Sequence, residues 1–302
     1  MRKITELRKG MKNEGIDCLA IVPGPNLYYI TSKKFHLSER PVVLFIEQNN
    51  LTFILPELES QKLSGLDVEF LTYSDALGPQ KRFDDFLEDK NFERIGIESR
   101  IMRHLELNLI DRNNSEIIDS MFLFADLRTK KSKDEIEMIQ KAVIIAENSL
   151  NKIIDNLILG ISEKDFASLL VMELLKNGSE SDLPFSPIVA SGTNGSNPHH
   201  FPTDKIIGDN ELVIIDWGAN YQGYFSDITR TFATGKSIDS KLLDAFESVR
   251  LANAAARERS AIGVTAGDVD LAARSIIDER GFGDYFIHRT GHGSGLEIHE
   301  EP

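Results

Sequence analysis

The sequence predicts an α/β protein of two domains. The chain has 302 residues, which is longer than most single domains. In its first third, short apolar runs alternate with segments of helical periodicity. Near residue 126 this pattern gives way to long amphipathic helices on either side of a β-rich stretch. We therefore expect one domain at residues 1–125 and a second at residues 126–302.

The first domain is expected to hold a mixed sheet. Short runs rich in β-branched and aromatic residues, bounded by Gly, Pro or Asn, predict strands at 17–22, 42–47, 51–55, 68–73 and 94–98. Helical periodicity predicts helices at 2–14, 56–64, 79–89 and 103–112. The stretch "PGPNLYYITS" (23–32) has the composition of a turn-rich connection.

The second domain is expected to begin with a long helix at 132–157. Ser132 can cap this helix, and Glu135 stands at the capping-box distance. Its predicted buried face is Ile136, Ile139, Val143, Ala146 and Leu150. Further helices are predicted at 162–178, capped by Ser162 with Asp165 three residues later, and at 240–260 and 265–282. The β-rich stretch between the two helix pairs is 186–234.

Composition argues against several classes of function. The net charge of −14 repels nucleic-acid backbones and anionic membrane surfaces. No stretch approaches the roughly 20 apolar residues of a membrane span. The single cysteine, Cys18, excludes an intramolecular disulfide and a thiolate metal cluster, and its apolar neighbours predict burial. The charged start of the chain lacks a signal-peptide core, so we expect a cytoplasmic protein.

Two aspartates mark the segment 211–234. The run "LVII" predicts a buried strand that ends on Asp216, "GANYQG" predicts a turn, and "YFSDITRTF" predicts a returning strand that contains Asp227. Such a hairpin brings two carboxylates together, which is costly without a compensating positive charge. Either an arginine such as Arg230 or metal ions could supply that charge.

Histidines gather in two other segments of the second domain. A loop rich in Gly, Asn, Ser and Pro (188–207) ends on His199 and His200. The stretch "HRTGHGSGLEIHEEP" carries His288, His292 and His299. Its glycines argue against a helix, and "LEIHE" alternates as a strand would. The spacing matches neither a zinc-protease helix nor a zinc finger.

Two kinds of hydrolase fit these residues. Carboxylates with one imidazole suit Mn, Co, Fe or Zn, and two such ions about 3.5–4 Å apart generate a hydroxide nucleophile. The remaining histidines could then donate hydrogen bonds to the reacting carbonyl group. A serine hydrolase is the competitor, but "GHGSG" places Ser294 outside the strand-turn-helix context that such a nucleophile requires.

Three motifs together resemble one family. "LVIIDWGANYQGYFSDITRTF", "SGTNGSNPHH" and "HRTGHGSGLEIHEEP" resemble the proline-specific metallopeptidases of the pita-bread fold, the aminopeptidase P and prolidase family. Residues 1–125 resemble its creatinase-type N-terminal domain, and "LRTKKSKDEIEMIQKA" resembles its linker into the catalytic domain. The resemblance implies an α/β chain with a creatinase-type domain followed by a pita-bread domain.

The resemblance also implies roles for individual residues. Asp216, Asp227 and His292 match metal ligands, with Asp227 bridging two divalent ions. His199 and His299 match catalytic histidines that hold the substrate and the developing oxyanion, and His288 matches a residue of the substrate pocket. His200 follows a matched position and is given no role.

The expected activity is hydrolysis of peptide bonds that precede proline, by an Xaa-Pro aminopeptidase or dipeptidase. Manganese is the expected metal, with cobalt or zinc as alternatives, and a homodimer is the expected assembly. Proline-containing peptides are the expected partners, and the sequence does not choose between dipeptides and longer peptides. A metal-independent creatinase-like amidinohydrolase and a non-catalytic pita-bread binding module are the alternatives.

The family's dimetal centre also needs two glutamates downstream of the His292 motif. This sequence ends at Pro302 before such positions, and Glu297, Glu300 and Glu301 do not match them. We therefore expect a C-terminally truncated chain, with the last strands of the pita-bread domain missing, that binds metal weakly and has little activity.

Overall fold

The computed structural model describes residues 2–88, 90–111, 115–157 and 160–302. The chain divides into two compact units, Met1–Lys130 and Lys131–Pro302. Helix α5 (Met121–Thr129) belongs to the first unit and runs across residue 125, where the sequence suggested a boundary. In the described part of the chain, no helix combines the length and the apolar character needed to cross a bilayer.

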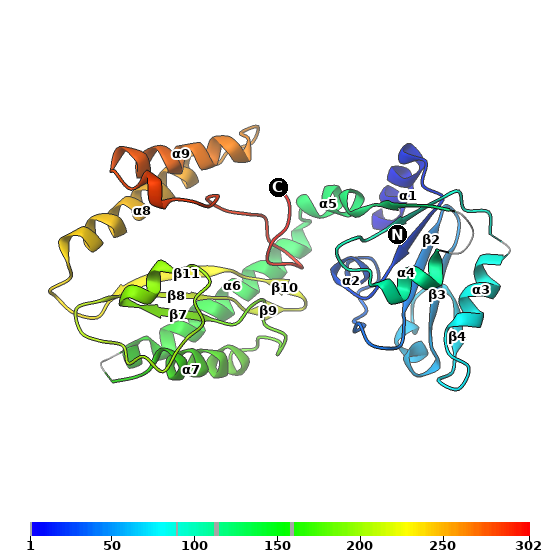
Figure 1. The fold of residues 1–302 in the computed structure, drawn as a ribbon, viewed down its shortest axis with the longest axis horizontal. Helices are drawn as coiled ribbons and strands as arrows, with labels where there is room; N and C mark the ends of the chain where they lie inside the picture. The colour runs from blue at the N-terminus through cyan, green and yellow to red at the C-terminus, as the bar shows by residue number, and fades with distance from the viewer. Residues whose placement is uncertain (1, 89, 112–114, 158–159) are drawn as a thin grey trace. The chain divides into compact units, whose positions relative to one another are not determined.

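The first unit is built on a six-stranded mixed sheet (Figure 1). Its strands are β1 (Cys18–Ile21), β2 (Val43–Glu47), β3 (Leu51–Pro56), β4 (Glu69–Tyr73), β5 (Arg94–Ile97) and β6 (Glu116–Asp119), in the order β4-β3-β2-β1-β5-β6. The first five were predicted and are confirmed. Strand β6 was missed because only two apolar residues stand between acidic ones, and it forms as an edge strand parallel to β5.

The helices of the first unit are α1 (Arg2–Glu14), α2 (Pro25–Thr31), α3 (Gln80–Glu88), α4 (His104–Ile110) and α5, with a 3-10 helix η1 at Glu57–Leu63. The prediction of a turn-rich connection at 23–32 is wrong, since α2 occupies it. Pro25 stands in the first turn of α2, where its missing N–H costs nothing. The predicted helix at 56–64 is the 3-10 helix η1, and residues 89 and 112 of two other predicted helices lie outside the described residues.

Alternating side chains cover both faces of this sheet. Leu19 and Ile21 pack with residues of α1 and α5 on one face. Cys18 and Ala20 pack with residues of α3 and α4 on the other. Cys18 is fully buried as predicted, and this burial raises the pKa of its thiol, so it acts as a small apolar side chain.

The second unit packs two helices against a small antiparallel sheet. The sheet has the order β11-β8-β7, from β7 (Ile188–Ser191), β8 (Leu212–Trp217) and β11 (Ile228–Ala233). Helices α6 (Lys133–Ile153) and α7 (Glu163–Lys176) share one apolar cluster with it. Helices α8 (Ser240–Arg259) and α9 (Ala266–Glu279) pack on each other (Figure 1). The short elements are β9 (Asn220–Tyr221), β10 (Tyr224–Phe225), and the 3-10 helices η2 (Ile154–Leu157), η3 (Gly192–Ser196) and η4 (Gly283–Tyr285).

The capping box of Ser132 and Glu135 is present at the start of α6, as predicted. The predicted buried face of this helix is only partly right. Its buried positions include Ala142, Ile145, Ala146, Ser149, Leu150 and Ile153, whereas Ile136 is 45% exposed. A prediction from apolar residues alone missed part of this face, because the polar Ser149 is buried there. Its hydroxyl donates to the Ile145 carbonyl.

A close backbone contact at Gly218 shapes the end of β8. A Cβ at this position would lie 2.0 Å from the Ser226 carbonyl oxygen and 2.6 Å from Cγ of Pro184. The preceding Trp217 is buried, and its indole N–H donates to the Ala146 carbonyl of α6 at 2.9 Å. Trp217 therefore fixes β8 on α6, while Gly218 lets the segment of Ser226 approach β8.

We expect the substitution Gly218→Ala to lower the free energy of unfolding by about 1–3 kcal/mol, because the added methyl group meets backbone atoms that cannot rotate away. The measurement is urea unfolding followed by circular dichroism. Gly267→Ala is the control, because the nearest atom to its Cβ would be Oγ1 of Thr265 at 3.8 Å. This variant should leave stability unchanged or raise it by up to about 1 kcal/mol. Equal unfolding midpoints for the two variants would contradict the argument.

Candidate functional site

Asp216 and Asp227 come from neighbouring parts of the β8–β11 region. Asp216 lies within β8, opposite Thr229 of β11, whose hydroxyl donates to its Oδ1 at 2.9 Å. Asp227 lies in the connection between β10 and β11. The prediction that it lies inside a strand is therefore wrong. The short hairpin of β9 and β10 fills the predicted turn and returns the chain toward β8.

The two carboxylates interact strongly. Burial, together with the charge and hydrogen bonding of Asp227, raises the pKa of Asp216 to about 6, although the hydrogen bond from the Thr229 hydroxyl acts to lower it. Arg230 does not neutralise them: its guanidinium donates to the Thr229 carbonyl and lies 4.0 Å from Glu147. The aspartate pair therefore carries negative charge that Arg230 does not offset, which is the electrostatic setting of a cation site.

His292 completes this group of acids. Its Nε2 lies 3.4 Å from Oδ2 of Asp227, and its Nδ1–H donates to the Gly293 carbonyl at 3.0 Å. That hydrogen bond places the ring proton on Nδ1 and turns Nε2, the usual metal-binding nitrogen, toward the carboxylate.

His299 packs against His292, with the ring centroids 4.3 Å apart. Burial lowers the pKa of His299, with further lowering by the nearby charges of His292, Arg289 and His199. His299 is therefore neutral near pH 7 and can donate one N–H. The structure thus gathers Asp216, Asp227, His292 and His299, with His199 close enough to act on His299 electrostatically.

The segment after His292 is a bend, so the predicted strand at "LEIHE" is wrong. It holds a single bridge between Gly293 and Glu300. The Glu300 carboxylate accepts the Leu296 amide at 2.8 Å and pairs with Lys131 at 2.9 Å. A Cβ at Gly295 would lie 2.7 Å from that carboxylate, so glycine here permits the fold-back. The absence of a helix around His288 and His292 is confirmed.

The contacts of His288 differ from those of the group formed by Asp216, Asp227, His292 and His299. Its ring lies edge-on to Phe286, with centroids 5.0 Å apart, and its Nδ1 donates to the Arg289 carbonyl. Its own carbonyl accepts from Arg274 of α9. These contacts connect His288 to α9 and not to the aspartates.

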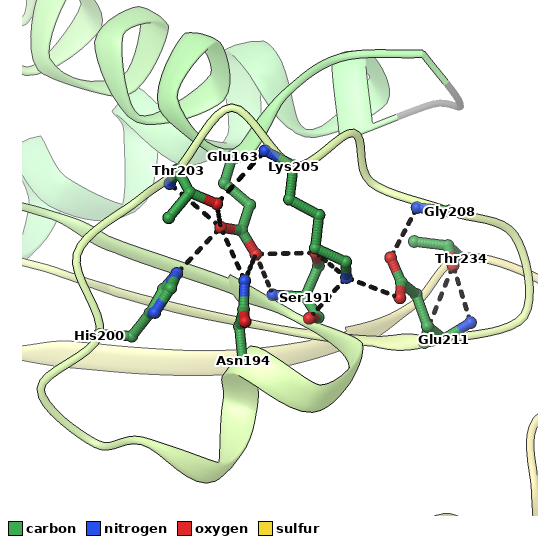
Figure 2. A network of polar contacts seen from close by, with 9 residues as sticks. All are labelled: Glu163, Ser191, Asn194, His200, Thr203, Lys205, Gly208, Glu211 and Thr234. Atoms are coloured by element: carbon green, nitrogen blue, oxygen red, sulfur yellow. Dashed lines mark hydrogen bonds and ion pairs between the residues drawn. The ribbon is translucent and has the colours of Figure 1, made fainter.

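Sequence reasoning missed Glu163, at the first turn of α7. Its buried carboxylate accepts Nε2–H of His200 at 2.9 Å (Figure 2). His200, to which the sequence analysis gave no role, therefore forms a hydrogen bond with Glu163. A glutamate directly after the helix-capping Ser162 was the available signal, but acids are common in the first turn of helices for reasons of dipole alone.

The donor chemistry of Asp216, Asp227 and His292 fits a divalent cation, because two carboxylates and one imidazole are the ligands that Mn, Co and Zn accept. Among the described residues, however, no three His, Cys, Asp or Glu side chains form a group that could hold a metal ion. These residues are therefore candidate ligands and not an assembled site.

Two family profiles match the chain. The profile of metallopeptidase family M24 matches residues 137–302, and that of the creatinase/prolidase N-terminal domain matches residues 3–130. The expected architecture, a creatinase-type domain followed by a pita-bread domain, is confirmed.

Relatives agree over nearly the whole chain. The Xaa-Pro dipeptidase of Pyrococcus furiosus is 35% identical over 99% of this chain and 84% of its own length, and that of Pyrococcus horikoshii is 33% identical over 99% and 83%. The crystal structure of a recombinant prolidase from Thermococcus sibiricus superposes with a TM-score of 0.94 at 34% identity, covering 100% of this chain and 83% of that one.

The comparisons leave the expected truncation a prediction, because the chain spans 84% and 83% of the two dipeptidases' own length and 83% of the prolidase chain. They do support a catalytic unit of the expected class, because the M24 profile covers the segment that carries Asp216, Asp227 and His292. The chain belongs to metallopeptidase family M24.

Proposed function

We propose that this protein is a metal-dependent peptidase that cleaves the bond before proline, with Xaa-Pro dipeptides as its main substrates. The observation that carries the proposal is the convergence of Asp216, Asp227 and His292 beside His299. The relatives named Xaa-Pro dipeptidase, at 35% and 33% identity, support the choice of substrate.

In this proposal Asp216, Asp227 and His292 would supply ligands to divalent metal ions, with manganese as the first candidate and cobalt or zinc as alternatives. Bound divalent ions polarise the substrate carbonyl and lower the pKa of a water molecule. The raised pKa of Asp216 supports its role, because a carboxylate with uncompensated charge nearby gains most from a cation.

The histidines would then orient the peptide. His299, neutral near pH 7 because its pKa is lowered, is proposed to donate an N–H to the carbonyl oxygen as negative charge develops there. His199, exposed on its loop, is proposed to hold the substrate, and the exposed His288 is proposed to line the pocket. Selectivity for proline would come from a pocket that fits the ring and requires no amide N–H.

Removal of a proposed ligand should abolish metal-dependent activity. We expect Asp216→Asn and Asp227→Asn to lower kcat/KM for Ala-Pro by at least about 100-fold with Mn²⁺ present, because each variant loses an anionic donor. Metal binding can be followed by calorimetry and by the fluorescence of Trp217, the only tryptophan and the neighbour of Asp216.

Asp67→Asn, at an exposed position of the first unit, is the matched control and should behave like the unchanged protein. If hydrolysis of Ala-Pro survives chelation, or if both site variants bind Mn²⁺ as tightly as the control, the proposed ligands are wrong.

Substrate length should separate a dipeptidase from an aminopeptidase. We expect kcat/KM for Ala-Pro to exceed that for Ala-Pro-Ala by at least about tenfold, and Ala-Ala to be cleaved poorly because it lacks the proline ring. Product release can be measured by chromatography with Mn²⁺ present. A preference for Ala-Pro-Ala would identify an aminopeptidase instead.

A further inference from the structure

Glu163 is a charged side chain with no exposed surface, and its carboxylate accepts hydrogen bonds from residues on both sides of His199. Its Oε1 accepts the amide and hydroxyl of Ser191, each at 2.8 Å, and the side-chain amide of Asn194 at 3.0 Å. Its Oε2 accepts from His200 at 2.9 Å and from the Thr203 hydroxyl at 2.9 Å (Figure 2). One carboxylate thus receives donors from the last residue of β7, Ser191, and from three residues of the loop that follows it.

These contacts hold the loop on both sides of His199. Ser191 and Asn194 precede it, and His200 and Thr203 follow it. The start of α7 adds two backbone bonds, because the amides of Glu163 and Lys164 donate to the carbonyls of Lys205 and Thr203, both at 3.0 Å. His199 itself is exposed, so the loop held by these hydrogen bonds leaves this imidazole accessible to solvent.

The charge of Glu163 strengthens its hydrogen bonds to the loop. Burial alone would raise the pKa of Glu163, but the hydrogen bonds from Ser191, His200 and Asn194 outweigh it and hold the pKa at about 2. The carboxylate is therefore ionised at neutral pH, and its bonds are charge-assisted. Two further charged groups lie close by: Nζ of Lys205 donates to the Ser191 carbonyl and lies 3.0 Å from the Glu211 carboxylate (Figure 2).

We propose that Glu163 is a positioning residue that fixes the imidazole of His199 for the reaction, through His200 and the two ends of the loop. The inference rests on the role proposed above for His199 in holding the substrate. Glu163 touches neither the substrate nor the metal ligands in this account. It acts by removing the alternative conformations that a loop of this composition would otherwise adopt.

The test is a double-mutant cycle with Glu163→Gln and His199→Ala. Glu163→Gln keeps the size of the side chain and removes its charge. We expect it to lower kcat/KM for Ala-Pro by about 10–100-fold, because a misplaced His199 no longer holds the substrate in the reactive position. In the His199→Ala background the same substitution should cost no more than about twofold, since the group it positions is already gone.

Two controls separate positioning from loss of stability. Glu106→Gln removes the charge of another fully buried glutamate, one held by Arg103 in the first unit, and should leave kcat/KM unchanged. Thr203→Val removes one hydroxyl donor to Glu163 and gives a milder variant should Glu163→Gln fold poorly. Because the pKa of Glu163 is lowered from 4.5, its stabilising effect is present above about pH 4.5 and is lost as the pH falls toward 2. The difference in urea midpoint between Glu163→Gln and the unchanged protein should therefore shrink from pH 7 to pH 3.

A direct readout is the NMR signal of the His199 ring, assigned by its loss in His199→Ala. It should shift or broaden in Glu163→Gln and stay in place in Glu106→Gln. If the fold-losses in kcat/KM of the two single variants multiply in the double variant, the inference is wrong. It is equally wrong if Glu163→Gln changes neither the His199 signal nor kcat/KM. If the unchanged protein does not cleave Ala-Pro, the proposed function fails, and the NMR signal alone then decides whether Glu163 positions His199.

Discussion

The second unit depends on the close approach of two backbone segments at Gly218. Only a residue without Cβ lets the Ser226 carbonyl pass at this distance, and Asp227 follows directly after Ser226. The contact therefore sets how near Asp227 lies to Asp216. Burial raises the pKa of Asp216 most, and the nearby charge of Asp227 raises it as well, so a positive charge beside the pair would be favourable. The close backbone contact and the chemistry of the site are one constraint, because the glycine that permits the packing also brings the charges together.

The same unit contains a second buried carboxylate with the opposite behaviour. The Glu163 side chain has no exposed surface, yet hydrogen bonds hold its pKa down at about 2. The difference lies in the donors: Glu163 is surrounded by amides, hydroxyls and an imidazole, whereas Asp216 has one hydroxyl and a neighbouring acid. A satisfied carboxylate stabilises a loop, and an unsatisfied one is suited to bind a cation. Burial alone therefore does not distinguish a structural acid from a functional one.

Local patterns predicted much of the fold. Five strands of the first unit and the caps of α6 and α7 were predicted correctly from residue type and order. The choice of Asp216, Asp227 and His292 as metal ligands stays a prediction. The errors fall where a contact distant in sequence decides the structure. Strand β6 forms because β5 offers an edge, and the segment of His299 bends because Glu300 reaches Lys131. The buried face of α6 was misjudged because Ser149 satisfies its hydroxyl within the helix.

By itself, the sequence determined the α/β class, the two-part organisation and the family, because these depend on periodicity and on motifs of fixed order. Tertiary structure decided which polar groups meet. It set His200 against Glu163 and not against the aspartates, kept Arg230 away from Asp216, and placed His299 on the ring of His292. The physical reason is that a hydrogen bond or a pKa shift depends on distances of a few ångströms between segments far apart in the chain, and no local pattern records those distances.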